Sequence, residues 1–558
     1  MYVNLIKEGV WFRMKKFTIN YNGKDIEVNE GEIFKNIVEE EDAVLCILNG
    51  SDFELTQKIP YSGQMEILTS NTEVGWNIYS RTLQYIFIKA SLDIFKDAKI
   101  VIQHSISRGI FGEILKEGEL TEEEISLIKK RMQELIDKDI KINKISVPRE
   151  KAIEIFKNYN MLDKVKLLSQ IELQNVSLYE LDGRYDYFYG PMAYSTGIIK
   201  AYDLIKYAHG FVLRNPEKEN VNILGKFIEQ KGLAKVFYET EEWLNVLGIG
   251  EVGSLNEKVL SREKKELMLT SEALHEKKIA YIADNIVKKP SIKMVLIAGP
   301  SSSGKTTFAN RLGIQLRVNG LVPVKISLDD YFVEREFTPR DENGDYNFEC
   351  IEAIDIKLFN ENLIDILKGK KVKLPSYNFK TGKREWHKEE FEFPKSGILI
   401  VEGIHGLNPL LTEKIPAENK YKVYISALTQ LNIDNHNRIA TTDVRKVRRI
   451  VRDYLSRGYD AEETLKMWPS IKKGEKKNIF VFQEEADDMF NSTLPYELCV
   501  LKPYAIQQLD KIGPESPVYG EAVRLKSFLS FFKEISVNDV LGNSILREFI
   551  GGSYFYEY

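Results

Sequence analysis

The segment Gly299–Thr306 constrains the fold of this chain more than any other feature of the sequence. It reads Gly-Pro-Ser-Ser-Ser-Gly-Lys-Thr and follows an apolar stretch, Met294–Ala298, with the length of a buried strand. A helix-forming stretch, Thr307–Val318, comes next. The two glycines let successive backbone N–H groups turn towards one anion, and the helix N-terminus adds partial positive charge. The sequence therefore predicts a strand, a phosphate-binding loop and a helix in that order.

Each residue type in this loop has an expected role. Lys305 is expected to reach the β and γ phosphates of a nucleotide, and Thr306 to offer its hydroxyl to Mg²⁺. The residues predicted to bind the nucleotide are Gly299, Ser301, Ser302, Ser303, Gly304, Lys305, Thr306 and Thr307. The alternative is a glycine-rich turn without phosphate, which the flanking strand and helix disfavour.

Carboxylates follow two further apolar stretches. Val322–Leu328 is followed by Asp329 and Asp330, and Gly397–Val401 is followed by Glu402. Because ligands of open α/β sheets bind outside the carboxyl ends of the strands, both positions are candidates for the site. A carboxylate there can hold Mg²⁺ or accept a proton from an attacking hydroxyl. A helix cap or a surface turn is the alternative for each of them.

The stretch from Asp443 to Asp453 has a helical arginine pattern. Its arginines are three or four residues apart and share one broad side of the predicted helix: Arg445, Arg448, Arg449 and Arg452. A positive surface of this kind suits a lid that neutralises a transferring phosphoryl group. The alternative is a solvated helix whose arginines pair with the two flanking aspartates.

Composition limits the classes of protein that remain. The 558 residues suggest several domains, and 43% hydrophobic with 29% charged residues excludes wholesale disorder. The net charge of −5 gives no global positive field for nucleic acid. The three cysteines form no CxxC pair, and the longest apolar runs fall far short of the roughly 20 residues of a membrane helix. We expect a soluble cytoplasmic protein that starts at Met1 or Met14.

The N-terminal half has a different pattern. Phe17–Tyr21 and Ile26–Val28 alternate around Asn22-Gly23, which predicts a β-hairpin. Helical stretches follow at Ser80–Phe95 and Thr121–Lys138, the second opened by a capping-box pattern. The charged stretch Glu263–Lys288 predicts a connecting helix with a solvated face rather than a partner-binding helix.

The region 292–509 resembles the uridine kinase and phosphoribulokinase family of P-loop kinases. Besides the loop and the arginine helix, the motifs are Leu328–Phe332, Tyr346–Glu349, Pro375–Phe379 and Val401–Gly403. The resemblance implies ATP and Mg²⁺ as cofactors, Asp329 as the base that activates the acceptor hydroxyl, and a metal environment of Thr306, Asp329 and Glu402. It also implies lid residues Arg449, Arg452 and Arg457, of which the first two, with Lys305, act in catalysis and Arg457 binds the nucleotide. The implied acceptor contacts come from Tyr377, Glu349 and Arg449.

Two departures from this family affect the acceptor. No histidine occurs in Lys380–Arg384, where uridine kinases read the pyrimidine, and His387 is out of register. Tyr459 stands where the family tends to have a further basic residue, and Glu349 or Glu352 replaces aspartates near the ribose. A nucleoside kinase is the favoured interpretation, with an acceptor that can differ from uridine.

The region 15–220 resembles the TGS module and editing domain of threonyl-tRNA synthetases. The matching segments are Glu54–Tyr61, Ile67–Thr69, Leu120–Glu124 and Tyr189–Ala201. The HxxxH pair of the editing family is missing from Tyr79–Gln84, and Phe188 and Met192 replace its cysteine and later histidine. Without these groups neither water activation nor ligand placement survives, so we expect a binding or regulatory module.

These observations predict a multidomain protein of α/β and α+β class, with a mostly parallel sheet in the kinase-like part. The expected segments are a TGS-like β-grasp module (1–70), an editing-like domain (71–232), a helical connector (233–290), a P-loop domain (291–510) and a C-terminal helical docking segment (511–558). The expected function is ATP-dependent phosphorylation of a nucleoside 5′-hydroxyl, of uridine or cytidine first. The alternatives are an RNA- or tRNA-binding regulator with a nucleotide switch, and a kinase of another small alcohol or sugar phosphate. A homo-oligomer is compatible with the sequence, and no membrane partner is expected.

Overall fold

The computed structural model describes residues 15–340, 344, 346–378 and 381–556, so both candidate start positions, and Phe379 of the motif at Pro375, lie outside the described residues. The chain divides into two compact units. Unit 1 runs to Glu229 and also includes Asn432–Arg438 and Gly513–Arg524, whereas unit 2 contains the rest of the chain from Gln230. No helix among the described residues is both long and apolar enough to cross a membrane.

The first module of unit 1 is a five-stranded sheet of order β2-β1-β5-β3-β4. Its strands are β1 (Lys16–Tyr21), β2 (Lys24–Asn29), β3 (Ala43–Leu48), β4 (Ser51–Glu54) and β5 (Gly63–Thr69). The predicted hairpin joins β1 and β2, since Asn22 and Gly23 both have positive φ, as the turn requires. Strand β1 pairs with β5 in parallel, and the other pairings are antiparallel.

The second module of unit 1 packs helix α1 (Glu73–Ile94) against α2 (Glu122–Asp137). The capping box at Thr121 and Glu124 is present, as predicted. Helix α1 begins earlier than predicted because Thr72 caps it by accepting from the N–H of Gly75. The other elements are β6 (Lys99–Ile106), β7 (Gly109–Leu115), β8 (Asn143–Pro148), α3 (Arg149–Asn158), α4 (Leu162–Gln170), β9 (Asn175–Leu181), β10 (Arg184–Asp186), β11 (Asp203–Tyr207), β12 (Gly210–Arg214), β19 (Asn432–Asp434) and β20 (Asn437–Arg438). They include two antiparallel sheets, β11-β12-β7-β6 and β10-β9-β8.

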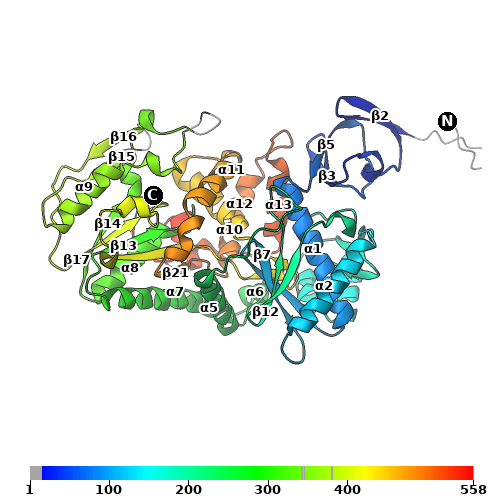
Figure 1. Ribbon diagram of the computed structural model, residues 1–558, viewed down its shortest axis with the longest axis horizontal. Helices are drawn as coiled ribbons and strands as arrows, with labels where there is room; N and C mark the ends of the chain where they lie inside the picture. The colour runs from blue at the N-terminus through cyan, green and yellow to red at the C-terminus, as the bar shows by residue number, and fades with distance from the viewer. Residues whose placement is uncertain (1–14, 341–343, 345, 379–380, 557–558) are drawn as a thin grey trace, which may run out of the picture. The chain divides into compact units, whose positions relative to one another are not determined.

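Unit 2 is built on a five-stranded, entirely parallel sheet of order β14-β17-β13-β18-β21 (Figure 1). The strands are β13 (Met294–Ala298), β14 (Val322–Ser327), β17 (Gly397–Glu402), β18 (Lys420–Ser426) and β21 (Asp488–Asn491). Alternate residues of β13 enter two different cores: Val295 and Ile297 pack with α8 (Lys305–Val318), and Met294 and Leu296 pack with α9 (Ile356–Leu367). The continuous apolar run of β13 is therefore explained by burial on both faces.

The remaining elements of unit 2 surround this sheet. They are α5 (Lys231–Leu247), α6 (Val252–Leu260), α7 (Lys264–Val287), β15 (Pro375–Asn378), β16 (Lys383–Trp386), α10 (Thr441–Arg452), α11 (Ala461–Asn478), α12 (Glu497–Leu509), α13 (Tyr519–Ser530, which begins in unit 1) and α14 (Arg547–Ile550). Helix α7 is less solvated than predicted. Its residues Ile279, Ile282 and Ile286 are buried in the core that α8 shares, and Glu272 pairs with the buried Arg311 of α8. The stretch predicted as a connector is thus part of unit 2.

Candidate active site

The loop at Gly299–Gly304 has the predicted shape. Gly304 caps α8 with φ of 86°, and Ser302 has φ of 59°, so the chain turns sharply between β13 and α8. A Cβ at Gly299 would lie 2.0 Å from the carbonyl oxygen of Ile425, so only glycine fits there. The buried hydroxyls of Ser302 and Ser303 have no hydrogen-bond partner among the described residues. Such donors are what the oxygens of a bound phosphate would satisfy.

Lys305 lies along this loop at the start of α8. Its Nζ donates to the carbonyl oxygens of Gly299 and Pro300, at 3.0 and 3.1 Å. Burial lowers the pKa of its ammonium group, while the charges of Glu402, Glu548 and Asp329 raise it. The lysine is therefore held by weak neutral acceptors, which the stronger negative charge of a phosphate can replace.

The candidate metal ligands lie at one edge of the sheet. Strands β14 and β17 end in register, with Ser327 opposite Glu402. The hydroxyls of Thr306 and Ser327 both donate to Oε1 of Glu402, each at 3.4 Å. Burial, and next the negative charge of Asp329, raises the pKa of Glu402 to about 7. Hydroxyl and carboxylate oxygens are ligands that Mg²⁺ prefers, and a cation would relieve this repulsion, so the residues present fit the metal.

Asp329 and Asp330 occupy a 3-10 turn, Leu328–Tyr331, after β14. The side chain of Asp329 is exposed, and its N–H donates to the hydroxyl of Ser327 at 3.3 Å. Asp330 has another partner, because its carboxylate accepts from the N–H of Tyr377 at 3.3 Å. Of the two aspartates, Asp329 is the one available to a ligand, while Asp330 holds strand β15.

Arg445 and Arg448 differ from the expected positive surface, because both are buried and paired. Arg445 pairs with Glu475 of α11, and Arg448 donates from Nε to Glu497 at 3.2 Å. Their guanidinium groups also donate to the loop, Arg445 to Ser301 O at 2.9 Å and Arg448 to Ser302 O at 3.3 Å. The two arginines thus brace the carbonyl side of the phosphate-binding loop.

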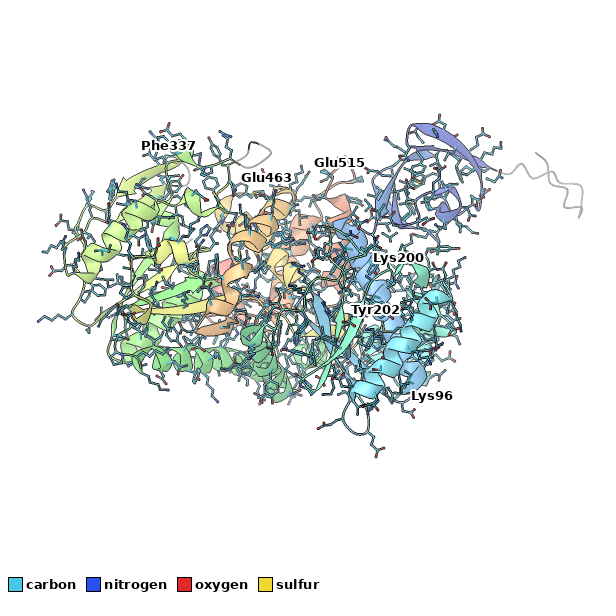
Figure 2. All side chains as sticks on the ribbon, viewed as in Figure 1. Lys96, Lys200, Tyr202, Phe337, Glu463 and Glu515 are labelled. Carbon is cyan, nitrogen blue, oxygen red and sulfur yellow. The ribbon has the colours of Figure 1, made fainter. Side chains whose placement is uncertain are left out.

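Helix α11, which carries Glu475, has a defined beginning. Figure 2 shows Glu463 at the start of α11, where it forms a capping box with Asp460.

Asp453 gathers the other three arginines. This fully buried aspartate lies 3.0 Å from Arg449 Nε, 2.7 Å from Arg452 and 3.9 Å from Arg457, whose side chain is half exposed. The alternative interpretation from the sequence is a solvated helix whose arginines pair with the flanking aspartates. The pairing with Asp453 occurs, but the helix, α10, is largely buried. Arg449 also donates to the hydroxyl of Ser301 at 2.7 Å, and burial lowers its pKa. The three predicted lid arginines form one cluster, and Arg449 reaches the loop.

The two remaining predicted acceptor residues have different surroundings. Burial, and next the charge of Glu475, raises the pKa of Glu349 to about 7, while Arg449 opposes this shift. Glu349 thus lies in the electrostatic environment of the loop. The ring of Tyr377 is buried in the core that also contains Ile326 of β14, and it packs against Phe332 with ring centroids 5.6 Å apart. Stacking on an acceptor base would require this ring to leave the core.

The C-terminal segment adds residues that the sequence did not reveal. Oε2 of Glu548, which is 7% exposed, accepts from the backbone N–H of Thr307 at 3.0 Å. The hydroxyls of Tyr556 and Thr307 lie 2.7 Å apart. The same segment lines a cavity of about 460 Å³ with Leu455, Ser456, Phe549, Ile550, Gly551, Gly552, Ser553 and Tyr556. The sequence analysis predicts a docking segment at 511–558, but no pattern in the sequence indicates that it docks on the first turn of α8.

Comparisons with known proteins separate two parts of the chain. Residues 294–496 match the model of the Phosphoribulokinase / Uridine kinase family. The N-terminal region is related to threonine–tRNA ligases: that of Caldanaerobacter subterraneus subsp. tengcongensis is 33% identical over 183 residues, 32% of this chain and 28% of that protein. The ligase of Clostridium kluyveri is 29% identical over 218 residues, 38% of this chain and 34% of that protein. The chain thus spans about a third of the length of these relatives.

Two solved structures show a limited likeness to this chain. A possible uridine kinase from Bacillus stearothermophilus is 20% identical, with a TM-score of 0.26, and covers 38% of this chain and 97% of that one. A D-glycerate 3-kinase from Cryptococcus neoformans is 15% identical, with a TM-score of 0.23. The match covers 48% of this chain and 92% of that one. The family match and the ligase relatives confirm the two predicted resemblances, so the chain carries a P-loop kinase domain behind a synthetase-like region.

Proposed function

We propose that this protein transfers the γ-phosphoryl group of ATP, with Mg²⁺, to a hydroxyl of a small acceptor, first of all the 5′-hydroxyl of uridine or cytidine. The observation that carries the proposal is the convergence of Lys305, Thr306 and Glu402 at the carboxyl edge of the parallel sheet, with Asp329 within electrostatic range. The match of residues 294–496 to a kinase family supports it.

Mg²⁺ and ATP would supply a phosphoryl donor whose charge is partly neutralised. Thr306, Glu402 and Asp329 would hold the metal, directly or through water. Lys305 and the N–H groups of the loop would hold the phosphates, and Arg449, Arg452 and Arg457 would face the charge that develops on the equatorial oxygens. The arginine cluster at Asp453 supports this, because Arg449 and Arg452 are both paired with that aspartate and Arg449 already donates to the hydroxyl of Ser301.

The exposed carboxylate of Asp329 would accept the proton of the acceptor hydroxyl. As the acceptor oxygen bonds to the γ-phosphorus, the bond from that phosphorus to the bridging oxygen breaks, and ADP leaves with the electron pair. Glu349, in its ionised form, would accept hydrogen bonds from acceptor hydroxyls, and Tyr377 would border the acceptor. The products are the phosphorylated acceptor, ADP and the proton on Asp329.

The test is an acceptor screen with labelled ATP, using pyrimidine and purine nucleosides, sugar phosphates and other small alcohols. Transfer to uridine or cytidine supports the proposal, and Lys305→Ala should then lose nearly all turnover. Asp329→Asn should lose turnover but keep ATP binding. Matched controls are Lys370→Ala and Asp365→Asn, a surface ion pair at 2.8 Å beyond the site. Full activity in Asp329→Asn would remove it as the base.

A second candidate function is favoured by the synthetase-like N-terminal region. An RNA-binding regulator would hydrolyse ATP only when RNA is present, and would phosphorylate none of the acceptors. Adding tRNA to the same assay separates the two functions. A kinase of another small alcohol or a sugar phosphate would phosphorylate acceptors regardless of whether they carry a nucleoside base.

A further inference from the structure

Unit 1 contains a cavity that the proposed kinase function does not use. Its volume is about 460 Å³, within the range of small-molecule sites. The walls come from the end of α1 and the start of β6, from the turn between α3 and α4, from β10, and from the turn between β19 and β20. All of these segments belong to unit 1, so the cavity is formed within one compact body.

The guanidinium group of Arg184 lies on the wall of this cavity. Its Cζ is 4.5 Å from the centre of the Tyr159 ring, and its Nη2 is 3.8 Å from Sδ of Met161; both of these residues also line the cavity. In the described part of the chain Arg184 forms no ion pair, and its Nε is buried without a hydrogen-bond partner. Because an unsatisfied buried donor is costly and a guanidinium fork matches two oxygens of an anion, this group favours an anionic ligand.

The charges around the cavity favour an anion as well. Lys96, labelled in Figure 2, and Lys99 line the cavity besides Arg184, and neither lysine has an ion pair within the described ranges. Asp97 also lines it but is exposed, so water and salt screen its charge. Asp163 accepts a backbone hydrogen bond at 2.8 Å and lies in the first turn of α4, where the helix dipole compensates a negative charge. The cations are therefore the charges left for a ligand.

His436 adds a polar group of a different kind to the lining. It is 2% exposed, and its Nδ1 lies 2.7 Å from the carboxylate of Asp186. A carboxylate partner assigns the proton of the neutral ring to Nδ1, which makes Nε2 an acceptor. Among the residues that the structure describes, Nε2 has no partner. This nitrogen suits a hydroxyl of a ligand.

The rest of the lining suits an organic body and not a bare ion. Leu92 and Ile100 supply apolar surface, and the amides of Asn158 and Asn160 can both donate and accept. A free phosphate would use the cations alone. A molecule that joins an anionic group to a hydroxyl-bearing part would use all three kinds of group.

We propose that this cavity is a binding site for a small phosphate monoester, with its phosphate held by Arg184, Lys96 and Lys99 and a hydroxyl held by His436. A phosphate monoester carries a charge of about −1.5 to −2 at pH 7, whereas a carboxylate carries a single charge, so the monoester is the better match to three cations. None of these residues takes part in the proposed phosphoryl transfer, so ligand binding in unit 1 does not depend on that function.

The test is calorimetric titration of the full chain with ribose 5-phosphate. Inorganic phosphate, ribose and acetate are titrated separately as probes of the single groups. Hydrogen exchange of residues 92–100 and 158–163 with each probe shows where it binds, which is needed because the phosphate-binding loop of unit 2 is expected to bind phosphates too. We expect ribose 5-phosphate to bind more tightly than inorganic phosphate and to slow exchange in both segments, and ribose and acetate to leave both segments unchanged.

Three variants of the lining carry the test. Arg184→Met removes the guanidinium group and should weaken ribose 5-phosphate binding by about 10- to 100-fold, the range for a hydrogen bond to a charged group. His436→Asn keeps a donor for Asp186 and removes Nε2, so its loss should stay below about tenfold. The double variant Lys96→Gln and Lys99→Gln changes two exposed side chains, so its fold is safe, and it should weaken binding about 5-fold.

The matched control is Arg108→Met, since Arg108 is an exposed arginine of unit 1 that does not line the cavity. It should bind ribose 5-phosphate as the parent chain does. Slower exchange in both segments, lost in Arg184→Met and kept in the control, would support the site.

Four results would overturn the proposal. They are no binding of ribose 5-phosphate, binding that slows exchange only in the phosphate-binding loop, an unchanged affinity in the double lysine variant, and a loss in the Arg108 control equal to that in Arg184→Met. Equal affinities for inorganic phosphate and ribose 5-phosphate would show a site for the free ion and would overturn the assignment to a monoester.

Discussion

The contact between Glu548 and Thr307 predicts that the C-terminal segment competes with nucleotide. The N–H of Thr307 belongs to the first turn of α8, where the free N–H groups of a phosphate-binding helix point at the phosphates. Glu548 already accepts from this N–H at 3.0 Å. A carboxylate and a phosphate are both anions attracted to the same helix N-terminus, so the two cannot share this donor without repulsion. Glu548→Gln should therefore tighten ATP binding.

The expected magnitude follows from the burial of the contact. An acidic group at a helix N-terminus contributes about 0.3–1 kcal/mol at an exposed site and up to about 2 kcal/mol when partly buried. Since Glu548 is only 7% exposed, the upper value applies. At 1.4 kcal/mol per factor of ten, removal of this competitor should lower the Kd of ATP by about 30-fold. The glutamine keeps the shape of the side chain and an oxygen acceptor, so it removes mainly the charge.

The assay is calorimetric titration with ATP and Mg²⁺, together with thermal unfolding without nucleotide. Glu548→Gln should bind ATP more tightly and unfold at a lower temperature than the parent chain, because the same interaction that opposes ATP stabilises the free protein. Glu534→Gln, an exposed residue of the same C-terminal stretch, is the control and should change neither. Unchanged or weaker ATP binding in Glu548→Gln would refute the competition and make Glu548 a support of the loop.

Three further predictions concern the same unit. Because the pKa of Glu349 is raised to about 7, transfer to an acceptor that it binds should increase as the pH rises from 6 to 8. Glu349→Gln should reduce this increase and leave the part that comes from Glu402, whose pKa is also raised to about 7. Arg448→Met leaves the buried Glu497 without its cation and should cost about 3–5 kcal/mol in urea unfolding, whereas replacing both residues by apolar ones should cost less. Gly299→Ala should abolish nucleotide binding in the same titration, since its Cβ would lie 2.0 Å from the carbonyl oxygen of Ile425; retained binding would show that the loop can shift at little cost.

The parts of the site that could be predicted are those formed by residues close together in the sequence. Strand β13, the loop and α8 are consecutive, so the spacing of glycines, Lys305 and apolar residues determines their arrangement. The parallel sheet follows from the alternation of strands and helices, and it places Glu402 opposite Ser327 at the expected edge. Sequence order and elementary strand geometry were sufficient for this half of the site.

The arginine helix shows where such prediction ends. The spacing of the arginines gives the face that they share, but it does not show what covers that face. Glu475 and Glu497 lie 30 and 49 residues further along the chain from the arginines that they bind, and they turn a predicted surface into a buried brace. Glu548 is 241 residues from Thr307, and Asp434 is 270 residues from Lys164. Contacts over these separations depend on tertiary packing and leave no periodic signal in the sequence.

Two carboxylates accept hydrogen bonds from the two ends of the loop, that of Glu475 at Ser301 and that of Glu548 at Thr307. Their different surroundings indicate which of the two moves away when nucleotide binds. Glu475 accepts from the N–H of Ser301 at 2.8 Å and is paired with the buried Arg445, so moving it would leave a buried cation uncompensated. Glu548 lies on the short helix α14, within the C-terminal segment that also lines a cavity. Moving α14 frees the N–H of Thr307 and leaves the pair of Arg445 and Glu475 intact. Nucleotide binding should therefore displace the C-terminal segment and leave α10 in place, which hydrogen exchange of residues 545–556 with and without ATP would show.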